Sequence, residues 1–184
     1  MPESSSFSFT LPTRVHFGEG EVHALPAEAA ALRFRRPLVV TDAHLAAADP
    51  SLSAMRACRA AGLDVQVWEG VVPNPTDSSV HEGLAQYRSR GCDGLVALGG
   101  GSAIDTAKAI GVLVAGGGQE IGAYFEPDPA PIAPLPPLIA LPTTAGTGSE
   151  VTWVSIVTSS RTGRKAVIRN RALFPAVSIV DPAL

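Results

Sequence analysis

The chain has 184 residues, of which 46% are hydrophobic, so it can bury the core of one ordinary domain. Fourteen Lys and Arg against 17 Asp and Glu give a formal net charge of -3, and the basic residues are scattered apart from Arg33, Arg35 and Arg36, which argues against nucleic-acid partners. No apolar run approaches the roughly 20 residues of a membrane span, and the N-terminus lacks the basic and apolar regions of a signal peptide. We therefore expect a cytoplasmic protein with no membrane partner.

Cysteine and histidine do not suggest a metal site within this chain. Cys58 and Cys92 are 34 positions apart, whereas thiolate sites need close pairs such as C-x₂-C, so we expect core or surface thiols. The four histidines form no i,i+4 pair and no local arrangement with carboxylates; they are His16, His23, His44 and His81.

The first part of the chain alternates between predicted strands and helices. Alternating apolar residues at 7–17 predict a short edge hairpin around Pro12, and Gly18-Glu-Gly20 introduces a helix at about 21–31. The pattern then repeats, with strands predicted at 37–41, 64–68 and 94–98 and helices at 51–61, 77–90 and 102–115. This alternation predicts an α/β, Rossmann-like fold, a parallel sheet flanked by helices, in which ligands bind beyond the carboxyl ends of the strands.

The alternation of predicted strands and helices ends after Gly116. Six prolines between 126 and 137 indicate a stiff, irregular connection to a further strand at 137–142. Shorter apolar segments at 151–157, 165–168 and 176–180 predict a β-hairpin or meander appendage. We treat residues 1–184 as a single domain. Since the sequence stops directly after a predicted strand, we expect it to be a fragment of something longer.

The glycine-rich segment at 95–108 is the most informative part of the chain. Gly99, Gly100 and Gly101 follow an apolar strand and precede an amphipathic helix, so an anion can approach the main chain at the unpaired N–H groups of the first helical turn. A diphosphate fits this site. Ser102 is the expected N-cap with Asp105 at the capping-box position, and the structural interpretation of Lys108 is a solvated or C-terminally directed surface charge.

Other polar residues follow predicted strands, and several keep two interpretations. Asp42 either accepts the hydroxyls of an adenosine ribose, which favours NAD over NADP, or caps the next turn. Asn74, between two prolines, is favoured as a rigid turn over a ligand contact. Hydroxyls crowd a glycine-containing loop, where we favour ligand binding over local backbone bonding; they are Thr143, Thr144, Thr147 and Ser149. Glu150 is expected as a surface carboxylate rather than a general base.

Three segments together, Gly99–Lys108, Pro142–Glu150 and Asn74–Thr76, resemble the iron-containing (group III) alcohol dehydrogenase family. The segments Val15–Gly20 and Val180–Leu184 are similar to that family too. The resemblance runs through essentially the whole chain but covers only the N-terminal, cofactor-binding domain of the family.

The resemblance implies a dinucleotide site. Gly99, Gly100, Gly101 and Ser102 would bind the diphosphate, with Asp105 assigned to the same set, and Asp42 would bind the adenosine ribose. The rest of the dinucleotide would fall to Asn74, Thr143, Thr144, Thr147 and Ser149, with Lys165 as the basic residue near the cofactor.

The resemblance also implies what this chain lacks. Family members bind one Fe²⁺ or Zn²⁺ through an aspartate and three histidines of a helical C-terminal domain, and that domain is absent here. The chain would supply the NAD-binding half of an enzyme that transfers hydride between a small alcohol or aldehyde and NAD, NADP being less favoured. Two alternatives stay open: a non-catalytic dinucleotide-binding or assembly module, and an enzyme like dehydroquinate synthase or glycerol-phosphate dehydrogenase. The alternating edge at 7–17 could pair two copies into a homodimer.

Overall fold

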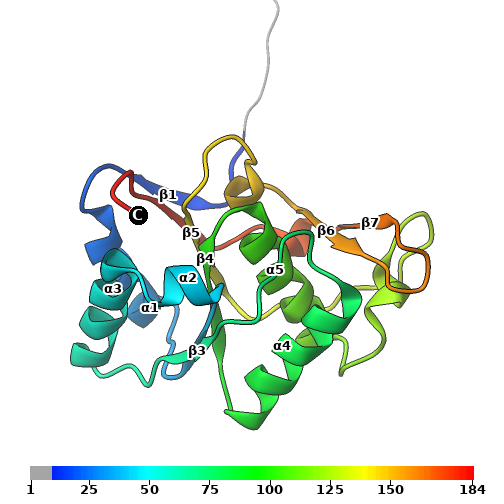
Figure 1. The fold of residues 1–184 in the computed structure, drawn as a ribbon, viewed down its shortest axis with the longest axis horizontal. Coiled ribbons are helices and arrows are strands. Elements are labelled where there is room, and N and C mark those ends of the chain that lie inside the picture. Colours follow the sequence, from blue (N-terminus) through cyan, green and yellow to red (C-terminus); the bar gives the residue numbers. More distant parts are fainter. Residues whose placement is uncertain (1–9) are drawn as a thin grey trace, which may run out of the picture.

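The computed structural model describes residues 10–184 and contains one six-stranded parallel sheet (Figure 1). Its order is β1-β8-β5-β4-β2-β3, and every neighbouring pair is parallel. The strands are β1 (Arg14–Phe17), β2 (Pro37–Val40), β3 (Gln66–Trp68), β4 (Gly94–Gly99), β5 (Leu138–Pro142) and β8 (Val177–Val180). The α/β fold expected from the strand and helix alternation is confirmed.

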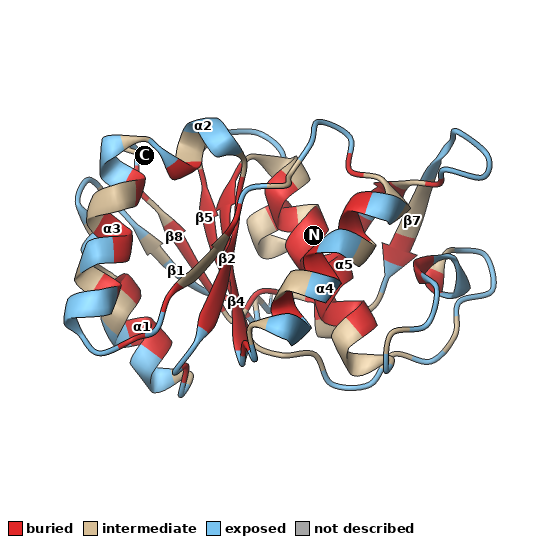
Figure 2. Ribbon diagram, turned by 60° about the horizontal axis from the view of Figure 1, so that its bottom comes forward, coloured by how far each residue is buried: buried red, intermediate tan, exposed pale blue. Residues whose placement is uncertain are grey.

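Helices cover both faces of this sheet (Figure 2). One face carries α1 (Leu25–Ala31) and α3 (Asp49–Ala60), and the other carries α4 (Asp77–Ser89) and α5 (Gly101–Ala115). Alternate residues of one strand point to opposite faces, so Val96 and Leu98 join the core under α1 and α3, whereas Leu95 and Ala97 join the core under α4 and α5. Burial on both sides explains the nearly continuous apolar strands.

The strand order reverses between β2 and β4. From β2 the chain moves outward to β3 and then returns through α4 to place β4 on the other side of β2. Such a switch point opens a crevice at the carboxyl ends of the two strands, which is where parallel sheets bind ligands. The short helix α2 (Ala43–Ala46) follows β2 there, and α5 follows β4.

A separate antiparallel hairpin lies beyond α5, formed by β6 (Val154–Thr158) and β7 (Lys165–Arg169) (Figure 2). The prediction of a three-stranded meander is therefore wrong in one respect. Strand β8 does not pair with the hairpin but lies between β1 and β5 of the main sheet. Short 3₁₀ turns complete the described chain: Glu21–Ala24, Ile121–Tyr124, Ser149–Val151 and Arg171–Leu173.

Smaller differences concern the first third of the chain. Residues 14–17 form one strand parallel to β8 rather than half of a hairpin, and residues 7–9 of the predicted hairpin lie outside the described residues. The helix expected at 21–31 divides into a 3₁₀ turn and α1. Across residues 10–184, none of the helices combines the length and the hydrophobicity needed to span a bilayer.

Candidate functional site

The turn between β4 and α5 is built from glycine for steric reasons. Gly99 has a φ of 145°, and a β-carbon there would lie 2.8 Å from Cβ of Ala103. Gly100 is the N-cap of α5 in an extended conformation, with no side chain bonded to the helix end. Ser102 is thus not the N-cap, because the helix begins one residue before it. The N–H groups of Gly101 and Ser102 come before the first bond of the helix, which Ala103 N–H makes to the carbonyl of Gly100 at 3.0 Å, and they lie at the positive end of the helix dipole.

The hydroxyl loop after β5 lies directly against this turn. A β-carbon at Gly100 would come within 3.0 Å of Oγ1 of Thr144, and one at Gly101 within 3.2 Å of Cγ2 of Thr147. The missing side chains therefore leave a cradle with main-chain N–H groups on one side and threonine side chains on the other. A phosphate oxygen needs this combination of close approach and donors.

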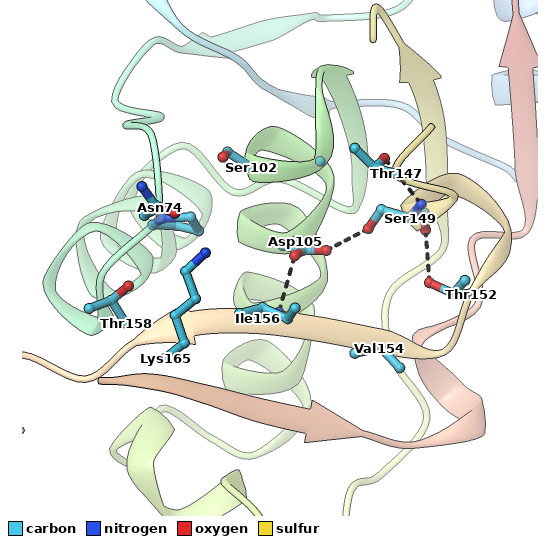
Figure 3. A pocket seen from close by; sticks show the side chains of 12 residues that line it. Asn74, Ser102, Asp105, Thr147, Ser149, Thr152, Val154, Ile156, Thr158 and Lys165 are labelled. Atoms are coloured by element: carbon cyan, nitrogen blue, oxygen red, sulfur yellow. Dashed lines mark hydrogen bonds between the residues drawn. The ribbon is translucent and has the colours of Figure 1, made fainter. Parts of the chain in front are cut away.

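Two cavities meet at this cradle and share Gly101 and Ser102. The larger cavity, of about 430 Å³, extends toward the β6–β7 hairpin (Figure 3). The smaller, of about 340 Å³, extends toward β2; its lining includes Asp42, Val71, Val72, Pro73, Gly100 and Thr144. A phosphate group at the shared wall would have one cavity on each side, which is the arrangement that the two halves of a dinucleotide require.

Asp42 follows β2 and faces the smaller cavity. Its Oδ1 accepts hydrogen bonds from the amides of His44, at 2.9 Å, and Leu45, at 3.0 Å, which caps α2. The capping interpretation of Asp42 is therefore observed. These two bonds also fix the direction of the carboxylate at the switch point, so the cap and a ribose contact are compatible.

Asn74 and Lys165 face each other across the larger cavity (Figure 3). Asn74 has a φ of 53°, an uncommon conformation for a residue other than glycine. The amide of Thr158 donates to the carbonyl of Pro75 at 2.7 Å, which ties this turn to the end of β6. Lys165 extends from β7 toward Asn74, so the hairpin supplies a cationic wall.

Asp105 and Lys108 have roles that the sequence did not indicate. Asp105 accepts hydrogen bonds from Oγ of Ser149 and from the amide of Ile156 instead of closing a capping box. Lys108 is 2% exposed rather than solvated, and its Nζ donates to three main-chain carbonyls. Burial lowers the pKa of Lys108 to about 8, although the negative charges of Asp105 and Glu150 act to raise it. Burial also raises the pKa of Asp105, which the bonds from Ser149 and Ile156 and the charge of Lys108 oppose.

Two predicted residues lie apart from the two cavities. Thr143 lines a third cavity, of about 290 Å³, near β1 and β8, and its amide donates to the carbonyl of Gly99 at 3.1 Å. Glu150 lines the same cavity; it is half-buried, not a surface carboxylate, and its Oε2 is buried without a partner among the described residues. Sequence reasoning missed several residues that line the larger cavity; they are Thr152, Val154, Ile156 and Thr158.

The described residues do not offer a metal site. Within residues 10–184, no three or more His, Cys, Asp or Glu side chains gather closely enough to hold an ion. His16 instead lies between Glu21 and Glu28, with Nε2 3.0 Å from the Glu28 carboxylate.

Comparison with known proteins gives a consistent assignment. Residues 12–182 match the family model for iron-containing alcohol dehydrogenase. The NAD-dependent methanol dehydrogenase of Bacillus methanolicus is 38% identical over 177 residues, which are 96% of this chain and 46% of that protein. The 4-hydroxybutyrate dehydrogenase of Cupriavidus necator is 42% identical over 174 residues, 94% of this chain and 45% of that protein.

Solved structures agree with these matches. A 1,3-propanediol oxidoreductase superposes with a TM-score of 0.89 at 35% identity, over 97% of this chain and 46% of that one. The sulfoacetaldehyde reductase of Bifidobacterium kashiwanohense in complex with NAD⁺ has a TM-score of 0.86 at 34% identity, over 98% of this chain and 47% of that one. The chain thus spans just under half the length of the relatives it matches. It belongs to the iron-containing alcohol dehydrogenase family, and the similarity is to the N-terminal domain of that family.

Proposed function

We propose that this chain is the NAD-binding half of a metal-dependent alcohol dehydrogenase. One observation carries the proposal: the glycine cradle at the start of α5 joins two cavities at a topological switch point. The family match and the NAD-dependent relative add support. The whole protein would act on a small alcohol or aldehyde, as the names of the relatives suggest for those proteins.

Each half of the dinucleotide has a proposed place. Gly99, Gly100, Gly101 and Ser102 would receive the diphosphate, because a bound anion there is met by free N–H groups and the helix dipole. Asp42 would receive the adenosine ribose in the smaller cavity. The nicotinamide riboside would occupy the larger cavity, whose proposed contacts are Asn74, Thr147, Ser149 and Lys165.

The bound NAD would supply a hydride acceptor, and the protein would place that acceptor and exclude water from it. The hydroxyl of Thr144 lies at the cradle beside Gly100 and suits a phosphate oxygen. Thr143 would act from the third cavity, beside the cradle rather than inside it. Asp105 would act through Ser149 and Ile156, which it holds in place. Fe²⁺ or Zn²⁺ would be bound outside residues 10–184, because the described side chains form no ligand set.

NAD is proposed over NADP because of Asp42. A carboxylate in the ribose position accepts both hydroxyls of NAD, whereas the 2′-phosphate of NADP would meet a like charge. Two amides hold this carboxylate at the switch point, so it cannot easily turn away from a phosphate.

Calorimetric titration of the chain with NADH and, separately, NADPH tests the proposal. We expect NADH to bind, and NADPH to bind at least about tenfold more weakly, since repulsion of 1.4 kcal/mol suffices for that ratio. Binding of NADPH at equal strength would remove Asp42 from the ribose role. Failure of both dinucleotides to bind would contradict the proposed function.

We infer three further properties. Residues 1–184 would form a single domain, since the six-stranded sheet takes its strands from both ends of the described residues, from β1 to β8. Strand β1 would pair two copies into a homodimer, because it is a sheet edge on which Val15 and Phe17 are 43% and 75% exposed. Sedimentation of a Phe17→Lys variant as a monomer would support this pairing.

The protein would work in the cytoplasm, where Cys58 and Cys92 remain free thiols.

A further inference from the structure

Lys108 is the one lysine that the described structure buries, and it has a complete set of acceptors. Its Nζ donates to the carbonyls of Ser149, Thr152 and Val154 at 2.7, 2.8 and 2.9 Å. An ammonium group carries three N–H donors, so the three short bonds use all of them, and Oγ1 of Thr152 is a fourth, longer contact at 3.4 Å. These carbonyls belong to a segment more than 40 positions away along the chain.

The three residues held by Lys108 are also residues of the site. Ser149, Thr152 and Val154 all line the larger cavity. Asp105, one turn earlier on the same face of α5, holds the two ends of this segment through Ser149 and Ile156. The hydroxyl of Ser155 completes the contact by donating to the main-chain carbonyl of Asp105 at 2.8 Å.

The groups around the ammonium cannot replace all three of its bonds, because the hydroxyl and the amide of Thr152 reach only the carbonyl of Ser149, each at 3.5 Å. The stem of Lys108 borders an apolar cavity of about 280 Å³, lined mainly by leucine, proline and alanine side chains. The charged groups that face Lys108 are Asp105 and Glu150, and neither carboxylate can donate to a carbonyl when ionised. Loss of the ammonium would therefore remove this donor from the carbonyls of Thr152 and Val154 and leave the Ser149 carbonyl with only its two long bonds from Thr152, which a buried segment can relieve only by moving.

We infer that Lys108 is a positioning residue, which fixes the wall formed by residues 149–154 to the phosphate-binding helix and thereby sets the affinity for the nicotinamide half of the dinucleotide. The inference rests on the proposed function. It separates two parts of the site. Asp42 and the main-chain N–H side of the cradle lie in the turns after β2 and β4, and none of these groups bonds to the Lys108 ammonium. The wall of the larger cavity does.

The test compares Lys108→Met, which keeps an unbranched side chain one atom shorter and removes its donors, with Arg56→Met. Arg56 is exposed on α3, which covers the opposite face of the sheet, so this control removes a positive charge far from the site. Calorimetry at pH 7 would measure the Kd of each protein for ADP and for NADH. ADP contacts only the proposed adenosine and diphosphate places.

For Lys108→Met we expect the Kd for NADH to rise at least about tenfold, the loss typical of hydrogen bonds to a charged group. The Kd for ADP should stay within about twofold, because the adenosine and diphosphate places do not bond to Lys108, and both constants of Arg56→Met should stay within the same range, because Arg56 is exposed and far from the site. Unchanged NADH binding in Lys108→Met, or equal loss of ADP and NADH, would overturn the inference. The second result would indicate a general loss of structure.

Amide hydrogen exchange gives a readout that needs no ligand. Lys108→Met should speed exchange at 151–156 and leave β4 unchanged, whereas unchanged exchange at 151–156 would contradict the inference. If Lys108→Met does not fold, Lys108→Gln, which keeps two donors and loses the charge, should show the same pattern to a smaller degree. A wild-type chain that binds neither ADP nor NADH would refute the proposed function, and the exchange data would then decide separately whether Lys108 holds this segment.

Discussion

Alanine at Gly99 should mainly reduce stability, whereas alanine at Gly101, only two residues away, should mainly weaken NADH binding. At Gly99 the φ of 145° disfavours a side chain, and the new β-carbon would lie 2.8 Å from Cβ of Ala103. A left-handed backbone costs about 1–2 kcal/mol and overpacking about 1–3 kcal/mol, so we expect Gly99→Ala to lose about 2–5 kcal/mol of unfolding free energy.

Gly101 is different because it is the first residue of α5 and has no positive φ. Its new β-carbon would lie 3.2 Å from Cγ2 of Thr147, a contact that a small shift relieves. Alanine also gains up to about 1 kcal/mol of helix propensity, so the unfolding free energy should change by less than about 1 kcal/mol. The methyl group would nevertheless stand in the cradle, and we expect the Kd for NADH to rise at least about tenfold, or 1.4 kcal/mol.

Urea unfolding and calorimetry would measure both quantities for each variant. Gly117→Ala is the matched control, because Gly117 has a φ of 70° but nothing within 4 Å of the new β-carbon. It should lose about 1 kcal/mol of unfolding free energy from the backbone alone and leave NADH binding unchanged. Wild-type affinity for NADH in Gly101→Ala would refute the assignment of the cradle, and wild-type stability in Gly99→Ala would refute the steric argument for the turn.

Three other measurements test separate parts of the account. Asp42→Gly should shift the ratio of NADH to NADPH affinity toward NADPH; an unchanged ratio would remove Asp42 from specificity. Burial lowers the pKa of Lys108 from 10.5 to about 8, so between these pH values the unfolded chain binds more protons. The unfolding free energy of the wild type should therefore rise with pH relative to Lys108→Met, by at most about 3 kcal/mol; a flat difference in urea titrations would contradict this. Burial raises the pKa of Cys58 and of Cys92 to about 11, so iodoacetamide at pH 8 should label them far more slowly in the folded than in the urea-unfolded chain, and equal rates would contradict their burial.

The hydrophobic pattern of each segment predicts where the strands of the main sheet lie better than it predicts which strands pair with each other. The segments around β2, β4 and β5 are short, apolar and separated by helices, so a parallel sheet follows from composition and connection length. The segment at β8 has the same apolar character, and nothing in its own residues distinguishes an insertion between β1 and β5 from a continued meander. The position of β8 depends on its contacts with β1 and β5, which are more than 30 residues away along the chain. The hydrophobic pattern of a short segment carries no information about such distant partners.

Within the candidate site, too, contacts between segments distant in the sequence could not be predicted from residue types. The glycine turn and the start of a helix were predicted from residue types, because Gly99 meets a steric requirement of the backbone. Burial of Lys108 was not predicted, since the three carbonyls that accept from it come from the segment before and within β6. Asp105 was expected to cap its own helix for the same reason: its true partners, Ser149 and Ile156, are adjacent only in the fold.

Amide resonances followed during an NADH titration of the isotope-labelled chain would show where the dinucleotide binds. We expect the largest shifts at Gly100, Gly101 and Ser102, with smaller shifts at Thr147 and at the end of β2. Largest shifts at the apolar cavity beside Phe174, with the glycine turn unaffected, would mean that the glycine turn is not the diphosphate site.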